Sequence, residues 1–305
     1  MRKPPARLKL TAVAADEGLA LDAFLVRRGG ITEALAREAI ERGGAFLRGK
    51  RVRDPLAPVR ARDLVEVSLR TEGRPSALGR DRVLHLDRDV LVVDKPAGVT
   101  AQEDRAGGES LPDLCSALLA EMGEPTQALL VHRLDRGTTG VTLLARNQRA
   151  HAFFLEEFRE RHVTKEYRAL ATGVPATSEG VVELALGADP RVPGLRRHDP
   201  QGDAARTRYS VLERLREATL FAAFPETGRT HQIRVHLREL GHPILGDGRY
   251  GGASHVSRPD GARHELARPM LHALSLELRH PSGRALCVRA FEPADFLAAL
   301  AFLRG

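Results

Sequence analysis

The spacing of apolar residues in the first 70 positions predicts two helices followed by short strands. Apolar residues recur at helical spacing from Leu19 to Leu25, and a second helical pattern runs from about Thr32 to Glu41, where two glycines end it. A strand with a glycine turn follows over residues 45–52, and residues 63–69 alternate with a period of two. This order predicts a small αβ domain over residues 1–70.

The remainder of the chain has the pattern of a larger, mixed domain. Residues 71–80 lack periodicity and are rich in Gly, Pro and Ser, which is typical of a linker. From residue 81 onward, strand-like runs at 83–86, 90–93, 141–145 and 167–171 alternate with single helices. We therefore expect an α+β domain over residues 81–305, with a large mixed, mainly antiparallel sheet flanked by helices.

The first 70 residues resemble the small RNA-binding domain of ribosomal protein S-four, in which a helix pair and the following loop present basic groups to structured RNA. The resemblance supplies a set of candidate phosphate contacts. These are Arg37, Arg42, Arg48, Lys50 and Arg51. A generic αβ domain with a solvated basic face is the alternative interpretation.

Composition favours a polyanionic partner without proving one. The 47 Lys and Arg outnumber the 40 Asp and Glu, for a net charge of +7, which suits nucleic acid but also an ordinary solvated surface. With 4% aromatic residues and no Trp, an extended base-stacking platform is not expected. No secretory signal and no apolar run of ~18 residues can be recognised, so we expect a cytoplasmic protein with no membrane partner.

A single acid stands among cations in residues 131–140. Asp135 lies between Arg133 and Arg136 and close to His132, and a carboxylate beside fixed cations stays ionised. It can then act as a nucleophile or a base. The following glycines predict a turn into the strand at 141–145, where a substrate can approach the backbone closely. Taken alone, the segment also fits a surface ion cluster.

A strand pattern at residues 165–170 carries an aromatic residue. Its period of two places Tyr167 and Ala169 on one face, and Glu166 and Arg168 on the other. Tyr167 can stack on a base or relay a proton through its hydroxyl, and the alternative is a half-buried core tyrosine.

A helix of about three turns is predicted within residues 227–243, with Thr230 as its N-cap. Its apolar stripe and its cationic side lie on different faces, so that Arg234 can reach an acid from another segment. The stripe consists of Ile233, Leu237 and Leu240, and the other side carries His231, Arg234 and Arg238. The histidine spacing does not suit zinc, and no metal is predicted.

Together and in this order, the three segments resemble the RluA-type family of pseudouridine synthases. The matching motifs are His132-Arg133-Leu134-Asp135, Lys165-Glu166-Tyr167 and Gly228 to Arg234, with flanking matches at residues 92–98, 242–247, 271–273 and 280–281. The resemblance implies that Asp135 is the catalytic aspartate, Arg234 its buried ion-pair partner and Tyr167 the aromatic side chain against the target base. No cofactor is implied.

The resemblance further implies an RNA substrate whose backbone is held by basic residues of these motifs. They are Lys95, Arg133, Arg136, Lys165, Arg229 and His231. The added N-terminal domain is similar to that of family members acting on large-subunit ribosomal RNA rather than on tRNA, and we expect a monomer.

Two other functions compete with this interpretation. A non-catalytic RNA-binding ribosome-assembly factor would be favoured by loss of Asp135 or Arg234, but both residues are present. Another nucleic-acid enzyme using one aspartate is the second, although a nuclease usually needs clustered carboxylates for metal, and none surround Asp135.

Overall fold

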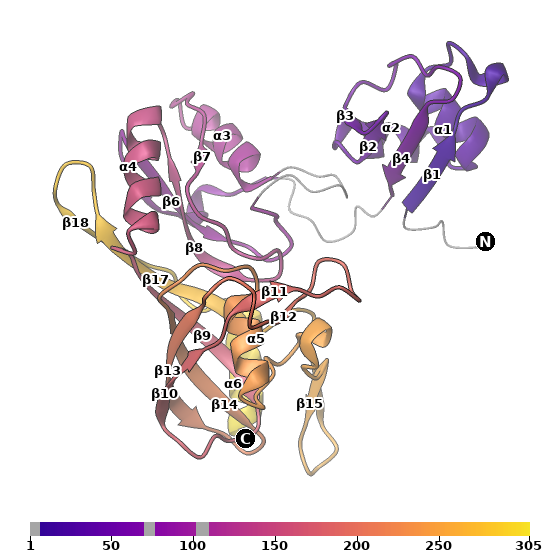
Figure 1. The fold of residues 1–305 in the computed structure, drawn as a ribbon. Coiled ribbons are helices and arrows are strands. Elements are labelled where there is room, and N and C mark those ends of the chain that lie inside the picture. The colour runs from indigo at the N-terminus through magenta and orange to yellow at the C-terminus, as the bar shows by residue number, and fades with distance from the viewer. Residues whose placement is uncertain (1–6, 70–76, 102–109) are drawn as a thin grey trace. The chain divides into compact units, whose positions relative to one another are not determined.

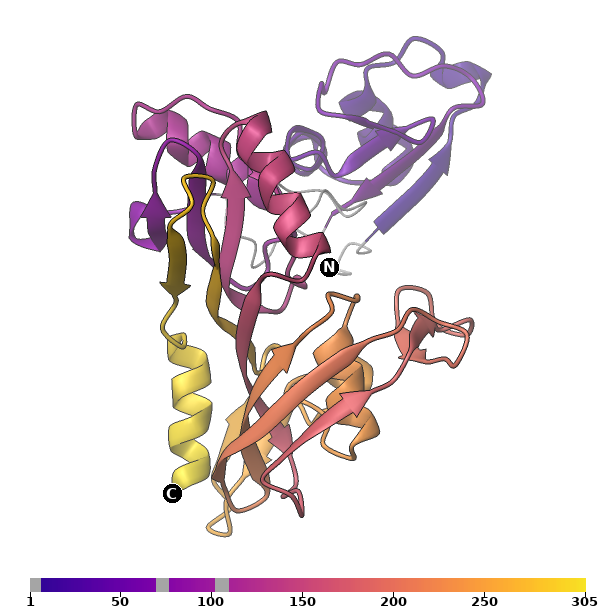
Figure 2. The ribbon, with the colours of Figure 1, turned by 60° about the vertical axis from the view of Figure 1, so that its left-hand side comes forward.

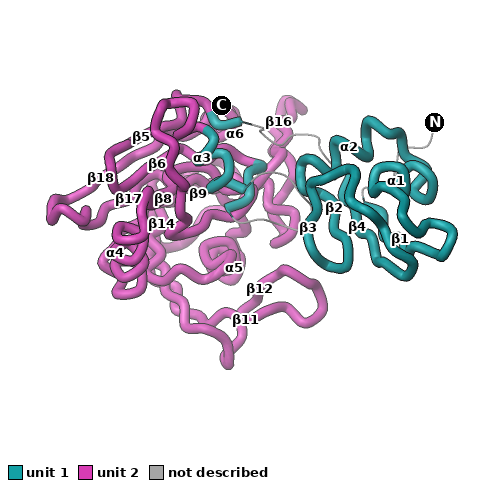
Figure 3. Tube along the Cα trace, turned by 90° about the horizontal axis from the view of Figure 1, so that it is seen from above, with its two compact units in different colours: residues 1–78, 98–117 teal, residues 79–97, 118–305 magenta. Residues whose placement is uncertain are grey.

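The computed structural model describes residues 7–69, 77–101 and 110–305, which divide into two compact units (Figures 1 and 3). Unit 1 contains residues 1–78 and 98–117, and unit 2 contains residues 79–97 and 118–305. Of the predicted linker at 71–80, residues 71–76 lie outside the described residues. The domain limits of the sequence analysis therefore stay a prediction.

Unit 1 begins with the two predicted helices and a small antiparallel sheet. Its strands pair in the order β1-β4-β2-β3. Thr32 caps the second helix by accepting a hydrogen bond from the Leu35 amide at 3.3 Å, and Leu21, Phe24 and Leu25 are fully buried. The elements are β1 (Arg7–Thr11), η1 (Ala14–Asp16), α1 (Leu21–Gly29), α2 (Glu33–Glu41), β2 (Ala45–Leu47), β3 (Lys50–Val52) and β4 (Leu64–Ser68).

Unit 2 is built on a 10-stranded sheet with the order β10-β13-β14-β9-β17-β8-β6-β5, to which β7 and β18 add at β8 and β17. All its strand pairs are antiparallel except β8 with β17. Its strands are β5 (Val83–Leu86), β6 (Val90–Lys95), β7 (Leu129–Leu130), β8 (Thr139–Ala145), β9 (Thr164–Thr172), β10 (Glu179–Glu183), β13 (Arg206–Arg214), β14 (Ala218–Pro225), β17 (Leu271–Arg279) and β18 (Ala285–Arg289).

Helices and two small hairpins complete unit 2. Figure 2 shows α5 in orange and α6 in yellow on opposite sides of the sheet. The remaining elements are η2 (Arg80–Arg82), α4 (Gln148–Arg159), β11 (Leu186–Ala188), β12 (Arg196–His198), α5 (Gln232–Glu239), η3 (Gly248–Tyr250), β15 (His255–Ser257), β16 (Arg263–Glu265) and α6 (Ala294–Arg304), while α3 (Leu111–Glu121) runs from unit 1 into unit 2. The predicted α+β class, with a mainly antiparallel sheet flanked by helices, is confirmed.

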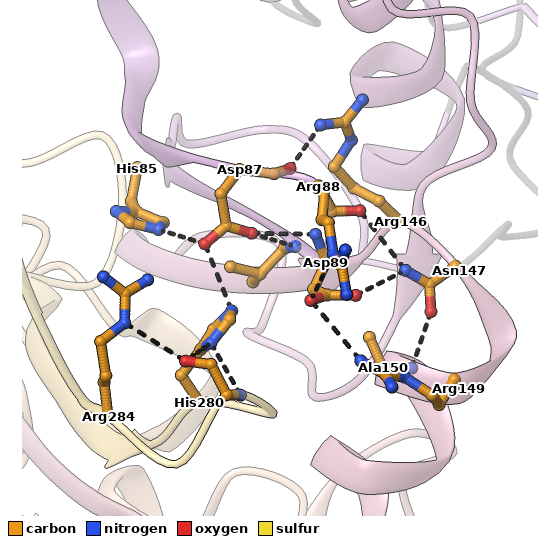
Figure 4. Close-up of polar contacts among 12 residues, drawn as sticks. His85, Asp87, Arg88, Asp89, Arg146, Asn147, Arg149, Ala150, His280 and Arg284 are labelled. Atoms are coloured by element: carbon orange, nitrogen blue, oxygen red, sulfur yellow. Dashed lines mark hydrogen bonds and ion pairs between the residues drawn. The ribbon is translucent and has the colours of Figure 1, made fainter.

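A polar cluster ties the β5–β6 turn to the β17–β18 turn and to α4 (Figure 4). One oxygen of Asp87 accepts the amides of Asp89 and Val90 at 2.9 and 3.0 Å, and the other lies 3.2 Å from Nε2 of His280. Asn147 donates to Asp89 at 2.9 Å and also caps α4. These contacts hold three chain turns together at one end of the sheet.

No helix among the described residues is both long and apolar enough to span a bilayer.

The glycines after Asp135 serve strand packing. Gly140 has φ +113, and an added Cβ would lie 2.1 Å from the carbonyl oxygen of Ala273 on β17. A Cβ on Gly137 would lie 2.9 Å from Pro269. The sequence suggests that these glycines let a substrate approach the backbone closely. In the structure, β17 makes that close approach instead, and the Asp135 loop lies against the start of β17.

We expect Gly140→Ala to lower the free energy of unfolding by about 2 kcal/mol or more, because the side chain meets backbone in a conformation that L-residues rarely adopt. Urea denaturation measures the change. Gly248→Ala is the matched control, since nothing lies within 4 Å of its Cβ position. Equal stability of the two variants would show that β8 and β17 do not require this close contact.

Candidate active site

Buried cations hold the backbone of the loop that carries Asp135. The loop turns tightly, with the Thr138 amide donating to the Asp135 carbonyl at 3.0 Å. Lys95 Nζ donates to the carbonyl of Arg136 at 3.4 Å, and Arg268 Nη1 donates to the carbonyl of Gly137 at 3.3 Å. Two successive carbonyls are therefore fixed by cations, which sets the direction of the aspartate that precedes them.

Arg234 joins Asp135 to a second carboxylate. Its Nη1 donates to Oδ2 of Asp135 at 2.9 Å, while Nε and Nη2 donate to the two oxygens of Asp247 at 2.6 and 2.8 Å. Asp247 is 1% exposed and Arg234 is 6% exposed. Burial alone would lower the pKa of Arg234, but the hydrogen bonds and charges of Asp247 and Asp135 outweigh it and raise that pKa above its ordinary value. The predicted buried partner is therefore in contact with Asp135.

The cationic side of α5 converges on Tyr250. The guanidinium carbons of Arg234 and Arg238 lie 4.8 and 5.7 Å from the centre of its ring. Nδ1 of His231 lies 2.7 Å from its hydroxyl, and Nε2 of the same imidazole lies 3.8 Å from Oδ2 of Asp135. His231, Arg234 and Arg238 thus share one side of the helix, as the periodicity predicts.

The start of α5 differs from the prediction. The N-cap is His231, in the left-handed region at φ 59, and the helix spans Gln232–Glu239 rather than starting after Thr230. The buried amide of Gln232 holds the segment before the helix: its oxygen accepts from the Arg229 amide at 3.0 Å and from Thr227 Oγ1 at 2.7 Å. The N-cap His231 makes no side-chain capping hydrogen bond, and the helix is about two turns long rather than three.

Tyr167 lies on the face of β9 that packs against the core, next to Ala169. Burial and the charge of Asp135 raise the pKa of its hydroxyl, so the group is neutral at physiological pH. On the opposite face, Arg168 pairs with Glu166 as the strand pattern predicts. No hydrogen bond to the Tyr167 hydroxyl occurs within the part of the chain that the structure describes.

His132 is held inside the fold. Its Nε2 accepts the Leu143 amide at 2.9 Å, and its ring stacks on Phe158 with centroids 4.7 Å apart. Burial lowers the pKa of His132 to about 3, so the ring is neutral. It positions the Asp135 loop against β8.

The predicted RNA contacts of unit 2 fall into two groups. Arg133, Arg136 and Arg229 are exposed, and Arg133 also contacts Thr230 while Arg229 donates to the Ala204 carbonyl at 3.2 Å. The three other predicted side chains point into the protein.

The three inward-pointing side chains do not have the predicted role of contacting RNA. Lys95 is 0% exposed, which leaves it no surface for RNA, and it holds backbone carbonyls instead. Both ring nitrogens of His231 face protein groups. Lys165 is half-buried and donates to the Thr227 carbonyl at 3.2 Å, and burial lowers its pKa to about 8. These residues shape the site from within.

The unit 1 candidates are mostly exposed. Arg48 and Lys50 lie at the β2–β3 turn, with Arg48 Nε 3.4 Å from Asp63, and the Arg51 guanidinium lies 5.2 Å from the Phe46 ring centre. Arg37 and Arg42 form ion pairs with acids on α1 and α2.

Sequence reasoning did not identify Asp247, Tyr250 or Arg268 as site residues. Asp247 lies within the flanking stretch at 242–247, but the sequence offered no sign that it is the main partner of Arg234. Arg268 also forms a two-point pair with Asp295, at 2.6 and 2.9 Å. Only the fold brings these side chains to the Asp135 loop.

Comparison with known proteins assigns the family. Residues 89–239 match the model of the RNA pseudouridylate synthase family. An uncharacterized RNA pseudouridine synthase of Mycobacterium bovis is 34% identical over 94% of this chain and 95% of its own length. The ribosomal large subunit pseudouridine synthase C of Salmonella typhimurium is 33% identical over 97% of this chain and 96% of its own.

A solved structure agrees with these sequence matches. Human RNA pseudouridylate synthase domain containing 4 superimposes with a TM-score of 0.59 at 28% identity, covering 73% of this chain and 93% of that one. The fold and site therefore define an enzyme that isomerises uridine in RNA. The chain belongs to the RNA pseudouridine synthase family, as its three sequence motifs predict.

The burial of Lys95 predicts a pH dependence of stability. Burial, which outweighs the opposing charge of Asp135, lowers the pKa of Lys95 to about 7. The unfolded value is about 10.4, so between these two values the unfolded chain binds more protons and rising pH favours the folded state. We expect the free energy of unfolding of the wild type, minus that of Lys95→Met, to rise by about 2 kcal/mol from pH 7 to pH 9. A difference that does not change with pH would mean that Lys95 titrates as in water.

Proposed function

We propose that this chain isomerises specific uridines of large-subunit ribosomal RNA, with Asp135 as its catalytic group and without a cofactor. One observation carries the proposal: the carboxylate of Asp135 is 2.9 Å from the guanidinium of Arg234, in a site where that cation is buried. Several relatives are named ribosomal large subunit pseudouridine synthases, which supports ribosomal RNA as the substrate.

The isomerisation of uridine needs only one carboxylate and the residues that position it. The bond between the ribose C1′ and the uracil N1 breaks, the ring turns over, C1′ bonds to C5, and the proton lost from C5 is balanced by one gained at N1. A carboxylate can start this sequence by attacking the ribose or by removing a ribose proton. Pairing with Arg234 keeps Asp135 charged when RNA excludes water from the site.

The substrate uridine must leave its stack to meet Asp135. We infer that the base is flipped out and held against Tyr167, whose hydroxyl has no hydrogen-bond partner within the described residues, while exposed arginines hold the phosphates. Those arginines are Arg133, Arg136 and Arg229, with Arg48, Lys50 and Arg51 contributing from an RNA-binding unit 1. The enzyme acts as a monomer in the cytoplasm.

We expect Arg234→Ala to reduce turnover at least ~100-fold, because it leaves both Asp135 and Asp247 without their cation. Release of tritium from ribosomal RNA labelled at uridine C5 measures the rate with purified protein. Arg304→Ala is the matched control, since it removes an arginine from an exposed pair with Glu213. Normal turnover by Arg234→Ala would refute the role given to the ion pair.

Binding of RNA should weaken steeply as salt rises. Each phosphate neutralised by a basic side chain releases condensed cations, so log Kd changes linearly with log salt concentration. Fluorescence anisotropy of a labelled ribosomal RNA fragment from 50 to 300 mM KCl gives the slope. A joint Arg133→Gln and Arg136→Gln substitution should flatten it by about one to two units. An affinity independent of salt would contradict the basic-surface argument.

A further inference from the structure

Tyr250 lies in a series of polar contacts that leads from β12 to Asp135. The backbone amide of Arg196, on β12, donates to the Tyr250 hydroxyl oxygen at 2.9 Å. The same oxygen lies 2.7 Å from Nδ1 of His231, whose Nε2 lies 3.8 Å from Oδ2 of Asp135. Tyr250 itself is 2% exposed.

The donors and acceptors in this series of contacts determine where the protons of Tyr250 and His231 lie. The Arg196 amide can only donate, so the Tyr250 oxygen accepts there and has its own proton to give. Within the described part of the chain, no acceptor other than Nδ1 of His231 lies within hydrogen-bond distance of that hydroxyl. A neutral imidazole that accepts at Nδ1 carries its proton at Nε2, which faces Asp135.

The His231 imidazole is neutral at physiological pH. Burial lowers the pKa of His231 to about 4, with Asp135 and Asp247 opposing the shift and Arg234 and Arg249 adding to it. Among the described residues, these four charged groups and Tyr250 are the main ionisable neighbours of the ring. The neutral Nε2–H form is thus favoured at physiological pH.

Both protein donors near Asp135 face the same oxygen. Arg234 Nη1 and His231 Nε2 approach Oδ2, and no donor to Oδ1 is found among the described residues. We propose that Tyr250 is a positioning residue that fixes His231 with its Nε2–H toward Oδ2 of Asp135, so that Oδ1 is the oxygen presented to the uridine. This inference rests on the proposed catalytic role of Asp135.

The ring and the hydroxyl of Tyr250 have separable roles. The ring packs beneath Arg234 and Arg238 and meets the imidazole edge-on, with centroids 5.5 Å apart. The hydroxyl alone connects Arg196 to His231. Tyr250→Phe therefore keeps the packing and removes only the group that sets the tautomer.

Tyr250→Phe tests the proposal on activity. We expect kcat to fall roughly tenfold and KM for RNA to stay within about twofold, because one hydrogen bond that orients the site is lost while the RNA surface is intact. Tyr209→Phe is the matched control, since that buried tyrosine hydroxyl bonds Thr177 at 3.0 Å and takes no part in the series of contacts to Asp135.

A double-mutant cycle separates positioning from general packing. His231→Gln removes the imidazole whose tautomer Tyr250 sets, so in that background Tyr250→Phe should have no further effect on kcat. A tenfold loss that persists in the His231→Gln background would overturn the proposal, because Tyr250 would then act on the site by another route.

The tautomer can be read without any activity. Long-range ¹H–¹⁵N spectra of histidine-labelled full-length protein, with the His231 signals assigned through His231→Gln, should show Nε2 protonated and Nδ1 unprotonated in the wild type. A mixture of tautomers is expected in Tyr250→Phe. An Nδ1-protonated wild type would overturn the inference, whereas a correct tautomer in a protein that modifies no uridine would refute the proposed function alone.

Discussion

The guanidinium of Arg234 is shared between two acids, and the arrangement of the site depends on that sharing. A buried arginine next to one exposed aspartate would be costly, because each charge loses its hydration. The two-point contact with Asp247, at 2.6 and 2.8 Å, satisfies Nε and Nη2 and leaves Nη1 directed at Asp135. The arginine fork is therefore made with Asp247 while a third nitrogen reaches Asp135, and lysine, with one nitrogen, could not make both contacts.

Different parts of the fold hold Asp135 and Arg234 in place. On the Asp135 side, Lys95 and Arg268 hold successive carbonyls, while Gly140 lets β8 lie against β17. On the Arg234 side, Gln232 fixes the start of α5. If Asp135 reacts as proposed, its carboxylate is held in place before RNA binds, which is the condition for electrostatic catalysis.

The sequence predicts those parts of the molecule that depend on local pattern. Helical spacing and caps locate α1 and α2, period two locates β9, and three ordered motifs indicate the family. It fails where the surroundings in the folded protein decide. The N-cap of α5 is His231 in the left-handed region, not the predicted Thr230. Burial turns Lys95 from a predicted RNA contact into a support for the loop. Asp247 and Tyr250 could not be assigned, because a lone acid and a lone tyrosine after a helix carry no sign of the arginine and imidazole they will meet.

We propose that Asp135 is the group that modifies uridine in ribosomal RNA. Mapping pseudouridine in total RNA from cells that lack the protein, complemented with the wild type or with Asp135→Ala, tests this role. We expect a site in large-subunit ribosomal RNA that is lost without the protein and restored only by the wild type. Restoration by Asp135→Ala would contradict the catalytic role of the aspartate, and an unchanged map would favour a non-catalytic RNA-binding role in ribosome assembly.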